Sequence, residues 1–510
     1  MSNKAVALAA LLATSVFPAA AAPAPAPTAK VDGGRLAGQE KDGVVSFLGI
    51  PYAAPPIGDL RWRAPQPAKP WQGIRQATQF SPVCPQIAAW VKMPQSEDCL
   101  ALNVWAPAHR AARPYPVLVY IHGGALMNGH GSEWGPEGAR SVVQKGVIFV
   151  SINYRLGVLG FFPHPELSAE SPDHAGGNQG FRDQIAALQW VKRNIRAFGG
   201  DPDNVTIAGE SAGGSSVAAL IVSPMAKGLF QHAISESGVI GGLMPKDVAE
   251  KSAKDRADTL KAPHLADLRK LSVEDLLKQG GGATVDVDGA VFTEQPDRSF
   301  AEGHQNKVPW LLGWNADEGV DLAPDSPLGA KDITATNYES RLQRVFGPQI
   351  PPFVLSSYPG KTDAQALASA QKLITDMIGL SHFGAATMQQ KTKTQPVYLY
   401  HYLHTPAEPT ADNPCYYGCK AGHTSEIRFA YGQLSRETRA WTKDDLALQE
   451  QMLGYWTNFA KTGDPNGGAL PKWPVFDGTP ATVQRLGSAS EIQERGNFPD
   501  FRPYLAMTGQ

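Results

Sequence analysis

The stretch VTIAGESAGG, residues 205–214, decides the fold. Its first four residues predict a short strand, and the small apolar residues over 212–220 favour a helix. Between the two, Gly209 and Gly213 flank Ser211, and glycines allow the sharp strand-to-helix turn that exposes a serine hydroxyl. A glycine-rich turn with an inert capping serine is the alternative, but the flanking strand and helix favour a nucleophile.

Strand and helix signals also alternate around this turn. Residues 117–121 and 147–152 are short β-branched and aromatic runs, while residues 179–198 carry apolar side chains at helical spacing before Gly199 ends the helix. This alternation predicts an α/β fold with a central, mostly parallel sheet flanked by helices. Residues 332–393 read as helical but less regular, and we expect a helical cap or side subdomain there.

A serine hydroxyl needs a base that removes its proton. We favour His423, which lies late in the chain. In proteins that present a serine on a strand-to-helix turn of this kind, the acid follows the serine in sequence and the histidine comes last. The acid must then lie between the two, where LLGWNADEG, residues 311–319, places Asp317 and Glu318 after a short apolar run. Spacing alone does not separate these two carboxylates.

Backbone amides are needed to hold the negative charge that forms on an attacked carbonyl. The amide of Ala212, directly after the nucleophile, is one candidate. The segment HGGA, residues 122–125, follows a predicted strand and can supply the others, because its small residues let the backbone approach a substrate. Taken by itself, HGGA is as consistent with an ordinary turn as with a segment that binds the oxyanion.

The bulk composition excludes several classes. Apolar residues make up 42% of the 510-residue chain, which is too many for a disordered protein and typical of a large core. The formal net charge of −2 gives no reason to expect nucleic acid or an anionic membrane as a partner. The chain contains no long linker or repeat, so we expect one large domain.

The N-terminus resembles an export signal. Residues 1–22 carry an early lysine, an apolar run over 5–13 and small residues before a cut expected after Ala22. That run is too short to span a membrane, so we expect no membrane anchor and a secreted or periplasmic protein. Residues 23–30 then form an Ala/Pro tether, and residues 31–510 form the domain.

Export permits disulfides. The cysteines are Cys84, Cys99, Cys415 and Cys419, and two local bridges, 84–99 and 415–419, are the simplest of three possible pairings. A metal site is disfavoured, because neither pair has the spacing of metal ligands. We expect no metal and no organic cofactor.

At this point the chain resembles the type-B carboxylesterase family, which includes cholinesterases and bacterial para-nitrobenzyl esterases. The resemblance extends from about residue 31 to about residue 476 and implies an α/β-hydrolase fold. It rests on FLGIPYA (47–53), LRW (60–62), EDCLALN (97–103), HGGA (122–125), NYRLG (153–157), GESAGG (209–214), DEG (317–319), WTNFAKTGDPN (456–466) and WP (473–474).

The resemblance also assigns roles. It implies Glu318 as the acid, His423 as the base, and the amides of Gly124, Ala125 and Ala212 as the oxyanion hole. Supporting positions follow in the same way: Glu210 beside the nucleophile, Ser237 next to Glu318, Glu426 after the histidine, the ion pairs Arg61–Glu97 and Arg155–Asp183, and an early Cys84–Cys99 bridge.

The resulting expectation is a serine carboxylesterase, monomeric and without a cofactor, that hydrolyses small-molecule esters through an acyl-enzyme. A lipase, thioesterase or amidase with the same triad is the main alternative, and a non-catalytic cholinesterase-like binding protein is a remote one. Arg182 and Arg428 stand where the family usually has apolar residues or proline. Contact of Arg428 with an anionic substrate group is one hypothesis, and a structural ion pair is the more ordinary reading.

Overall fold

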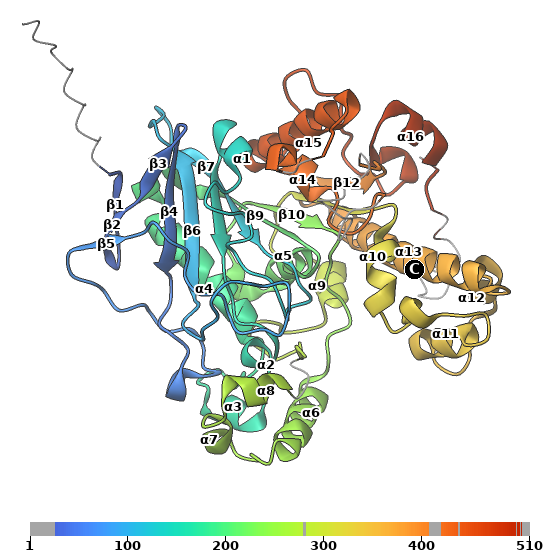
Figure 1. The fold of residues 1–510 in the computed structure, drawn as a ribbon, viewed down its shortest axis with the longest axis horizontal. Coiled ribbons are helices and arrows are strands. Elements are labelled where there is room, and N and C mark those ends of the chain that lie inside the picture. The colour runs from blue at the N-terminus through green and yellow to red at the C-terminus, as the bar shows by residue number, and fades with distance from the viewer. Residues whose placement is uncertain are drawn as a thin grey trace, which may run out of the picture.

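The computed structural model describes residues 26–278, 282–406, 420–436, 439–495, 497–499 and 501. A ten-stranded sheet forms its centre (Figure 1), in the order β13-β12-β11-β10-β9-β7-β8-β6-β4-β3. The strands are β3 (Gln39–Lys41), β4 (Val44–Pro51), β6 (Ala101–Pro107), β7 (Tyr115–Ile121), β8 (Ile148–Ile152), β9 (Gly200–Glu210), β10 (His232–Glu236), β11 (Trp310–Asn315), β12 (Val397–Tyr402) and β13 (Gln484–Leu486).

The sheet is mostly parallel, as expected. Neighbours pair in parallel from β8 across to β13, and only the edge formed by β6, β4 and β3 is antiparallel. The predicted fold class, an α/β-hydrolase sheet flanked by helices, is confirmed. Parallel strands that all end at one edge bring their C-terminal loops together, and this edge carries the candidate site.

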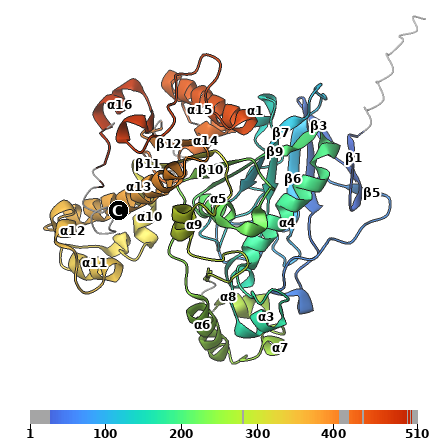
Figure 2. The same ribbon diagram turned by 180° about the vertical axis from the view of Figure 1, so that it is seen from behind.

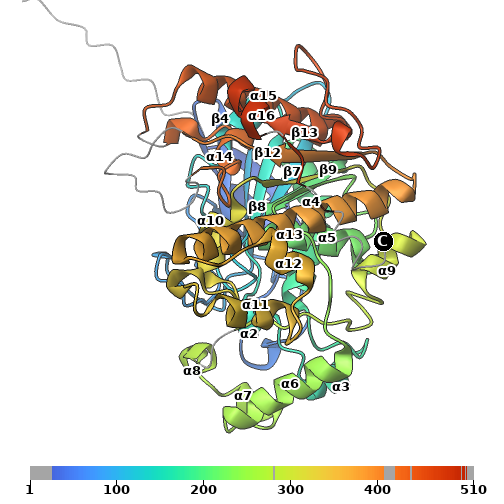
Figure 3. The same ribbon diagram turned by 90° about the vertical axis from the view of Figure 1, so that its right-hand side faces the viewer.

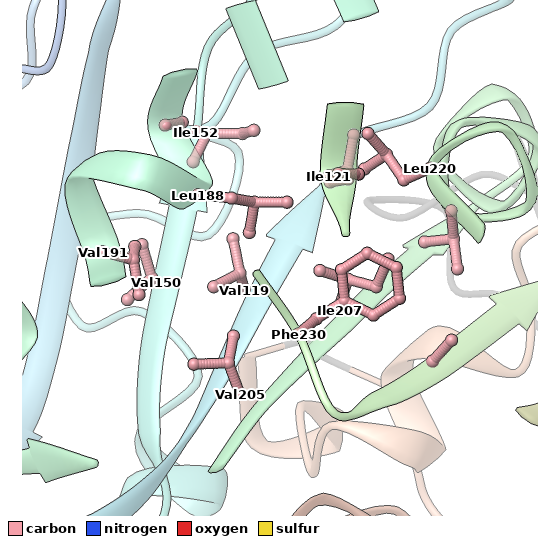
Figure 4. Packing of buried hydrophobic residues seen from close by; sticks show 14 of the residues in the cluster. Val119, Ile121, Val150, Ile152, Leu188, Val191, Val205, Ile207, Leu220 and Phe230 are labelled. Carbon is pink, nitrogen blue, oxygen red and sulfur yellow. The ribbon is translucent and has the colours of Figure 1, made fainter. Parts of the chain in front are cut away.

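Both faces of the sheet are buried, which explains why its central strands read as unbroken apolar runs. On one face, α4 (Gln179–Asn194) and α5 (Ala212–Val222) cover the sheet (Figure 2). Val119 and its alternate neighbours pack beneath these helices (Figure 4). On the other face, Tyr120 packs in a cluster with residues of α15 (Lys443–Thr462). The predicted helix ends as expected, with Gly199 at φ +89°.

The expected side subdomain is present. Helices α11 (Tyr338–Phe346) and α12 (Pro352–Ser357) pack with the first turns of α13 (Asp363–Lys391) around a hydrophobic cluster of their own (Figure 3). A second helical group was not predicted: α6 (Lys246–Thr259), α7 (Leu265–Leu268) and α8 (Val273–Lys278) share a cluster with Trp62 and Phe162. No helix in the described ranges is long and apolar enough to cross a membrane.

The N-terminal boundary needs a correction. Thr28, Ala29 and Lys30, which we assigned to a tether, belong to β1 (Thr28–Val31). This strand pairs with β2 (Gly34–Ala37), and with β5 (Ile74–Gln76) the two form a small separate sheet. The segment is ordered because Ala29 and Val31 are buried on alternate positions while β2 satisfies its backbone. Residues 1–25, with the expected signal, lie outside the described residues.

Candidate active site

The serine sits on a strained turn between β9 and α5. Ser211 has φ +56° and ψ −123°, and its amide donates a 2.8 Å hydrogen bond to the carbonyl of Glu236. A Cβ atom at Gly213 would lie 2.1 Å from the carbonyl oxygen of Ile121, and one at Gly209 would lie 2.5 Å from the Gly213 carbonyl carbon. Only glycine fits at either position, so the turn predicted from the sequence is enforced by packing.

The acid and the base meet at the ends of two distant segments. Glu318 begins α10 (Glu318–Leu322), directly after β11, and its Oε2 lies 2.6 Å from Nδ1 of His423. Its other oxygen accepts hydrogen bonds from the Asn315 amide at 2.9 Å and from the Ser237 hydroxyl at 2.5 Å. Of the two carboxylates that spacing left open, the structure brings Glu318 to the histidine and turns Asp317 away from it, toward Ala421.

The second ring nitrogen of His423 faces the nucleophile turn. Nε2 lies 3.2 Å from Oε1 of Glu210, the residue before Ser211. Burial lowers the pKa of His423, but the carboxylates of Glu210 and Glu318 outweigh burial and raise that pKa to about 10. Among the described contacts, His423 does not hydrogen-bond the Ser211 hydroxyl. Such contacts are often long in an unliganded enzyme and shorten when substrate binds.

The segment after β7 passes beside the serine. A Cβ atom at Gly123 would lie 3.2 Å from the Cβ of Ser211. Gly124 and Ala125 both have positive φ, +98° and +56°, and a Cβ atom at Gly124 would lie 2.2 Å from the carbonyl oxygen of Asn128. The positive φ values and the tight turn hold this backbone in a fixed, uncommon conformation next to the nucleophile.

His122, which precedes Gly123 and Gly124, has a structural role. The His122 ring stacks on Tyr154 with 4.4 Å between centroids, and the Tyr154 hydroxyl donates to the His122 carbonyl at 2.9 Å. Burial lowers the pKa of His122 to about 3, so its ring is neutral near pH 7. Tyr154 therefore fixes the path of the chain into Gly123 and Gly124.

Sequence reasoning missed one member of the site, Glu236. It ends β10 and accepts hydrogen bonds from the Tyr431 hydroxyl at 2.8 Å and from Trp456 Nε1 at 3.0 Å. Its backbone carbonyl holds the Ser211 amide, so these donors anchor the residue that supports the turn. The signal was available as a lone carboxylate at the end of a largely buried strand, HAISE.

The site thus contains a cluster of buried carboxylates. Burial raises the pKa values of Glu210 and Glu236 well above the ordinary value, and burial with the Glu318 carboxylate raises that of Glu426 to about 7. Glu426 is hydrogen-bonded by the Asn315 side chain. The raised pKa values of Glu210, Glu236 and Glu426 keep protons in this cluster. His423 and Glu210 share one of them, because each stabilises the charged form of the other.

The structural pairs lie where the resemblance implied. Arg61 is 2.7 Å from Glu97, Arg155 is 2.7 Å from Asp183, and Cys84 is bonded to Cys99. Arg182, which stands where the family usually has an apolar residue or proline, is buried and pairs with Asp173 at 2.7 Å. Cys415 and Cys419 lie outside the described residues.

The described residues contain one group of three side chains with metal-ligand spacing, Glu294, Glu302 and His304. It is largely exposed, and Arg298 pairs with both carboxylates. These pairs account for the group as a surface ion network, and none of its members belongs to the site around Ser211.

Comparison with known proteins agrees with this geometry. The model of the carboxylesterase family matches residues 23–499. An acylcarnitine hydrolase of Mus musculus is 36% identical over 86% of this chain and 82% of its own, and the para-nitrobenzyl esterase of Bacillus subtilis is 35% identical over 87% and 91%. The solved structure of a PNB esterase superposes with a TM-score of 0.74 at 34% identity, covering 88% of this chain and 93% of that one. The chain therefore belongs to the carboxylesterase family and is a serine hydrolase of carboxylic esters.

Proposed function

We propose that Ser211, His423 and Glu318 are the nucleophile, base and acid of this esterase. The observation that carries the proposal is the 2.6 Å contact between Nδ1 of His423 and the fully buried carboxylate of Glu318. That contact requires a proton on Nδ1, which leaves Nε2 as the basic nitrogen, directed toward the turn that presents Ser211.

The reaction follows from these positions. Nε2 of His423 removes the Ser211 proton while the serine oxygen bonds to the ester carbonyl carbon, and the carbonyl oxygen takes the negative charge. The amides of Gly124, Ala125 and Ala212 hold that oxyanion. The carbonyl then re-forms, the bond to the alkoxy oxygen breaks, and the imidazolium, stabilised by Glu318, gives its proton to that oxygen, which leaves as the alcohol and leaves Ser211 acylated. Water then adds to the acyl-enzyme by the same steps and releases the acid and the free serine.

We also propose that the protein is exported, after cleavage behind Ala22, to the periplasm or the medium. The signal-like pattern of residues 1–22 supports this, and so does the Cys84–Cys99 bridge, since disulfides persist in oxidising compartments. Mass spectrometry of protein expressed with its leader should find Pro23 as the first residue in the exported fraction. Protein that keeps its leader inside the cell would contradict the proposal.

The catalytic proposal is tested with p-nitrophenyl esters from acetate to palmitate, with and without a serine-directed organophosphate. We expect turnover that favours short acyl chains and is inhibited by the organophosphate. In Ser211→Ala, kcat should fall roughly 10⁴-fold or more. A preference for palmitate would move the assignment to lipase. Near-wild-type turnover in Ser211→Ala would exclude Ser211 as the nucleophile, and no turnover with no labelling would favour a binding protein.

A further inference from the structure

Asp317 lies beside the proposed acid but faces the loop that carries the base. Its amide donates to the Ala421 carbonyl at 2.8 Å, and its Oδ2 accepts from the Ala421 amide at 3.0 Å. Ala421 is fully buried and stands two residues before His423. Asp317 is thus joined by its own backbone to Glu318 and by two hydrogen bonds to the segment that presents His423.

The same Asp317 oxygen is paired with an arginine from the far C-terminal helix. Arg495, the last residue of α16 (Ala489–Arg495), places Nη2 at 2.5 Å from Oδ2 of Asp317. Its Nη1 donates to the carbonyl of Leu403, just after β12, at 3.1 Å. Asp317 and Arg495 therefore connect the ends of β11 and β12, the loop of the base and α16.

We propose that Asp317 and Arg495 are positioning residues that set the distance between His423 and Glu318. The proposal rests on the triad assigned under the proposed function. A triad needs its base within a few tenths of an ångström, because misplacement by about 1 Å costs roughly 100-fold in rate. Asp317 is suited to this task, since one residue fixes the acid on one side and the loop of the base on the other.

The pair is poorly placed to matter for stability alone. Its side chains are 19% (Asp317) and 30% (Arg495) exposed, and a pair with access to water contributes less to folding than a fully buried one. The segment that carries His423 is also held by a hydrogen bond outside this pair, from the Asn315 side chain to the Gly422 carbonyl at 2.8 Å. Loss of the Asp317 side chain should therefore loosen the loop without unfolding it.

Helix α16 remains attached when Arg495 is changed. His404 lies between two carboxylates, with Nδ1 at 2.8 Å from Glu491 of α16 and Nε2 at 2.7 Å from Asp445 of α15. The Thr405 amide donates to Glu491 at 2.7 Å as well. A substitution at Arg495 thus removes its contacts with Asp317 and Leu403 and leaves the main anchor of the helix in place.

The test compares Asp317→Asn, Arg495→Ala and Arg495→Lys with the matched control Arg269→Ala. Arg269 also belongs to a partly exposed arginine–carboxylate pair, with Glu170 (13% and 26% exposed), away from the site. Active-site titration with an organophosphate first gives the concentration of reactive serine. The kcat and KM for p-nitrophenyl acetate are then measured, with kcat calculated per reactive serine. We expect kcat to fall about 10- to 100-fold in Asp317→Asn and Arg495→Ala with KM little changed. Arg495→Lys should recover part of the loss, and Arg269→Ala should show none.

A pH profile separates positioning from a merely structural role. A looser contact with Glu318 stabilises the imidazolium of His423 less, so the acid limb of kcat/KM should move to lower pH in Asp317→Asn. A loss that appears only as fewer titratable sites, with wild-type kcat and pH profile per site, would overturn the proposal. If Asp317→Asn fails to fold, the Arg495 variants decide by the same criteria.

The two proposals fail in different ways. If the wild-type protein is not labelled at Ser211, the proposed triad itself is wrong. If wild type is labelled and the Asp317 and Arg495 variants turn over at the wild-type rate per site, the triad stands and the positioning role is wrong.

Discussion

The two halves of the proposed site are built in different ways. The nucleophile turn, from β9 through Ser211 into α5, is held by close backbone packing, because the last residues of β9 are paired on both sides, with β7 and with β10. The half that carries the acid and base is held by polar side chains, and its central contact joins Glu318 and His423 across 105 residues of sequence. One half depends on the absence of side chains at glycines, and the other depends on which side chains are present.

The difference explains what each kind of change should do. A Cβ atom added in the nucleophile turn has no space and should damage folding. A carboxylate or hydroxyl removed from the acid–base half leaves the sheet intact and should damage catalysis. Stability and rate therefore separate the two halves.

The largest effect is expected for Glu318→Gln. An amide of the same size cannot stabilise the imidazolium and favours the wrong tautomer, so kcat should fall roughly 10⁴-fold. The thermal unfolding midpoint, measured beside kcat on p-nitrophenyl acetate, should change far less. If Glu318→Gln unfolds the protein, or leaves kcat within tenfold of wild type, the description of this half is wrong.

Gly213→Ala should act mainly on stability, in contrast to Glu318→Gln. The new Cβ atom would lie 2.1 Å from the Ile121 carbonyl oxygen, and such overpacking should lower the free energy of unfolding by about 3 kcal/mol. Gly384→Ala is the matched control, because a Cβ atom there, also within a helix, meets no atom within 4 Å. Urea unfolding should show the control to be as stable as wild type or more so. Equal stability of Gly213→Ala and wild type would contradict the packing argument.

Glu210→Gln tests the pH dependence of kcat/KM. The Glu210 carboxylate faces Nε2 of His423 and raises the pKa of that ring, so the neutral base becomes populated only as the pH rises above the usual imidazole range. Removal of this charge should move the acid limb of kcat/KM about one unit to lower pH. A limb that stays in place, or moves to higher pH, would show that Glu210 does not act on the histidine.

The smallest effect is expected for Ser237→Ala. Its hydroxyl is one of two donors to Oε1 of Glu318, and the Asn315 amide remains. We expect kcat to fall about 5- to 10-fold, the equivalent of one hydrogen bond of roughly 1 kcal/mol. Ser237→Thr, which retains a hydroxyl, should recover part of the activity in the same assay.

The nucleophile half could be predicted from residue patterns. The apolar run over 205–208 and the glycines around Ser211 determine a strand, a turn and a helix locally, and β9 and α5 follow them. The acid–base half could be predicted from residue patterns only in part, because residue order favoured His423 but spacing left Asp317 and Glu318 open, and only the family resemblance implied Glu318. Asp317 and Glu318 are adjacent and chemically alike, and only the direction of the chain after β11 decides which one reaches His423.

Other differences have the same origin in long-range contacts. β1 carries no strong strand signal, and it forms because β2 supplies its hydrogen-bond partners. The group formed by α6, α7 and α8 shares its core with Trp62 and Phe162, which come from elsewhere in the chain. Glu236 joins the site through Tyr431 and Trp456, roughly two hundred residues away in sequence.

The central claim is that the serine presented by one half is activated by the histidine held in the other. The most direct test measures the rate at which an organophosphate modifies Ser211, located by peptide mass spectrometry, in wild type and in His423→Ala. We predict stoichiometric labelling of Ser211 in wild type and a rate at least about 10³-fold lower in the variant. Equal rates in the two proteins, or label on another residue, would contradict the claim.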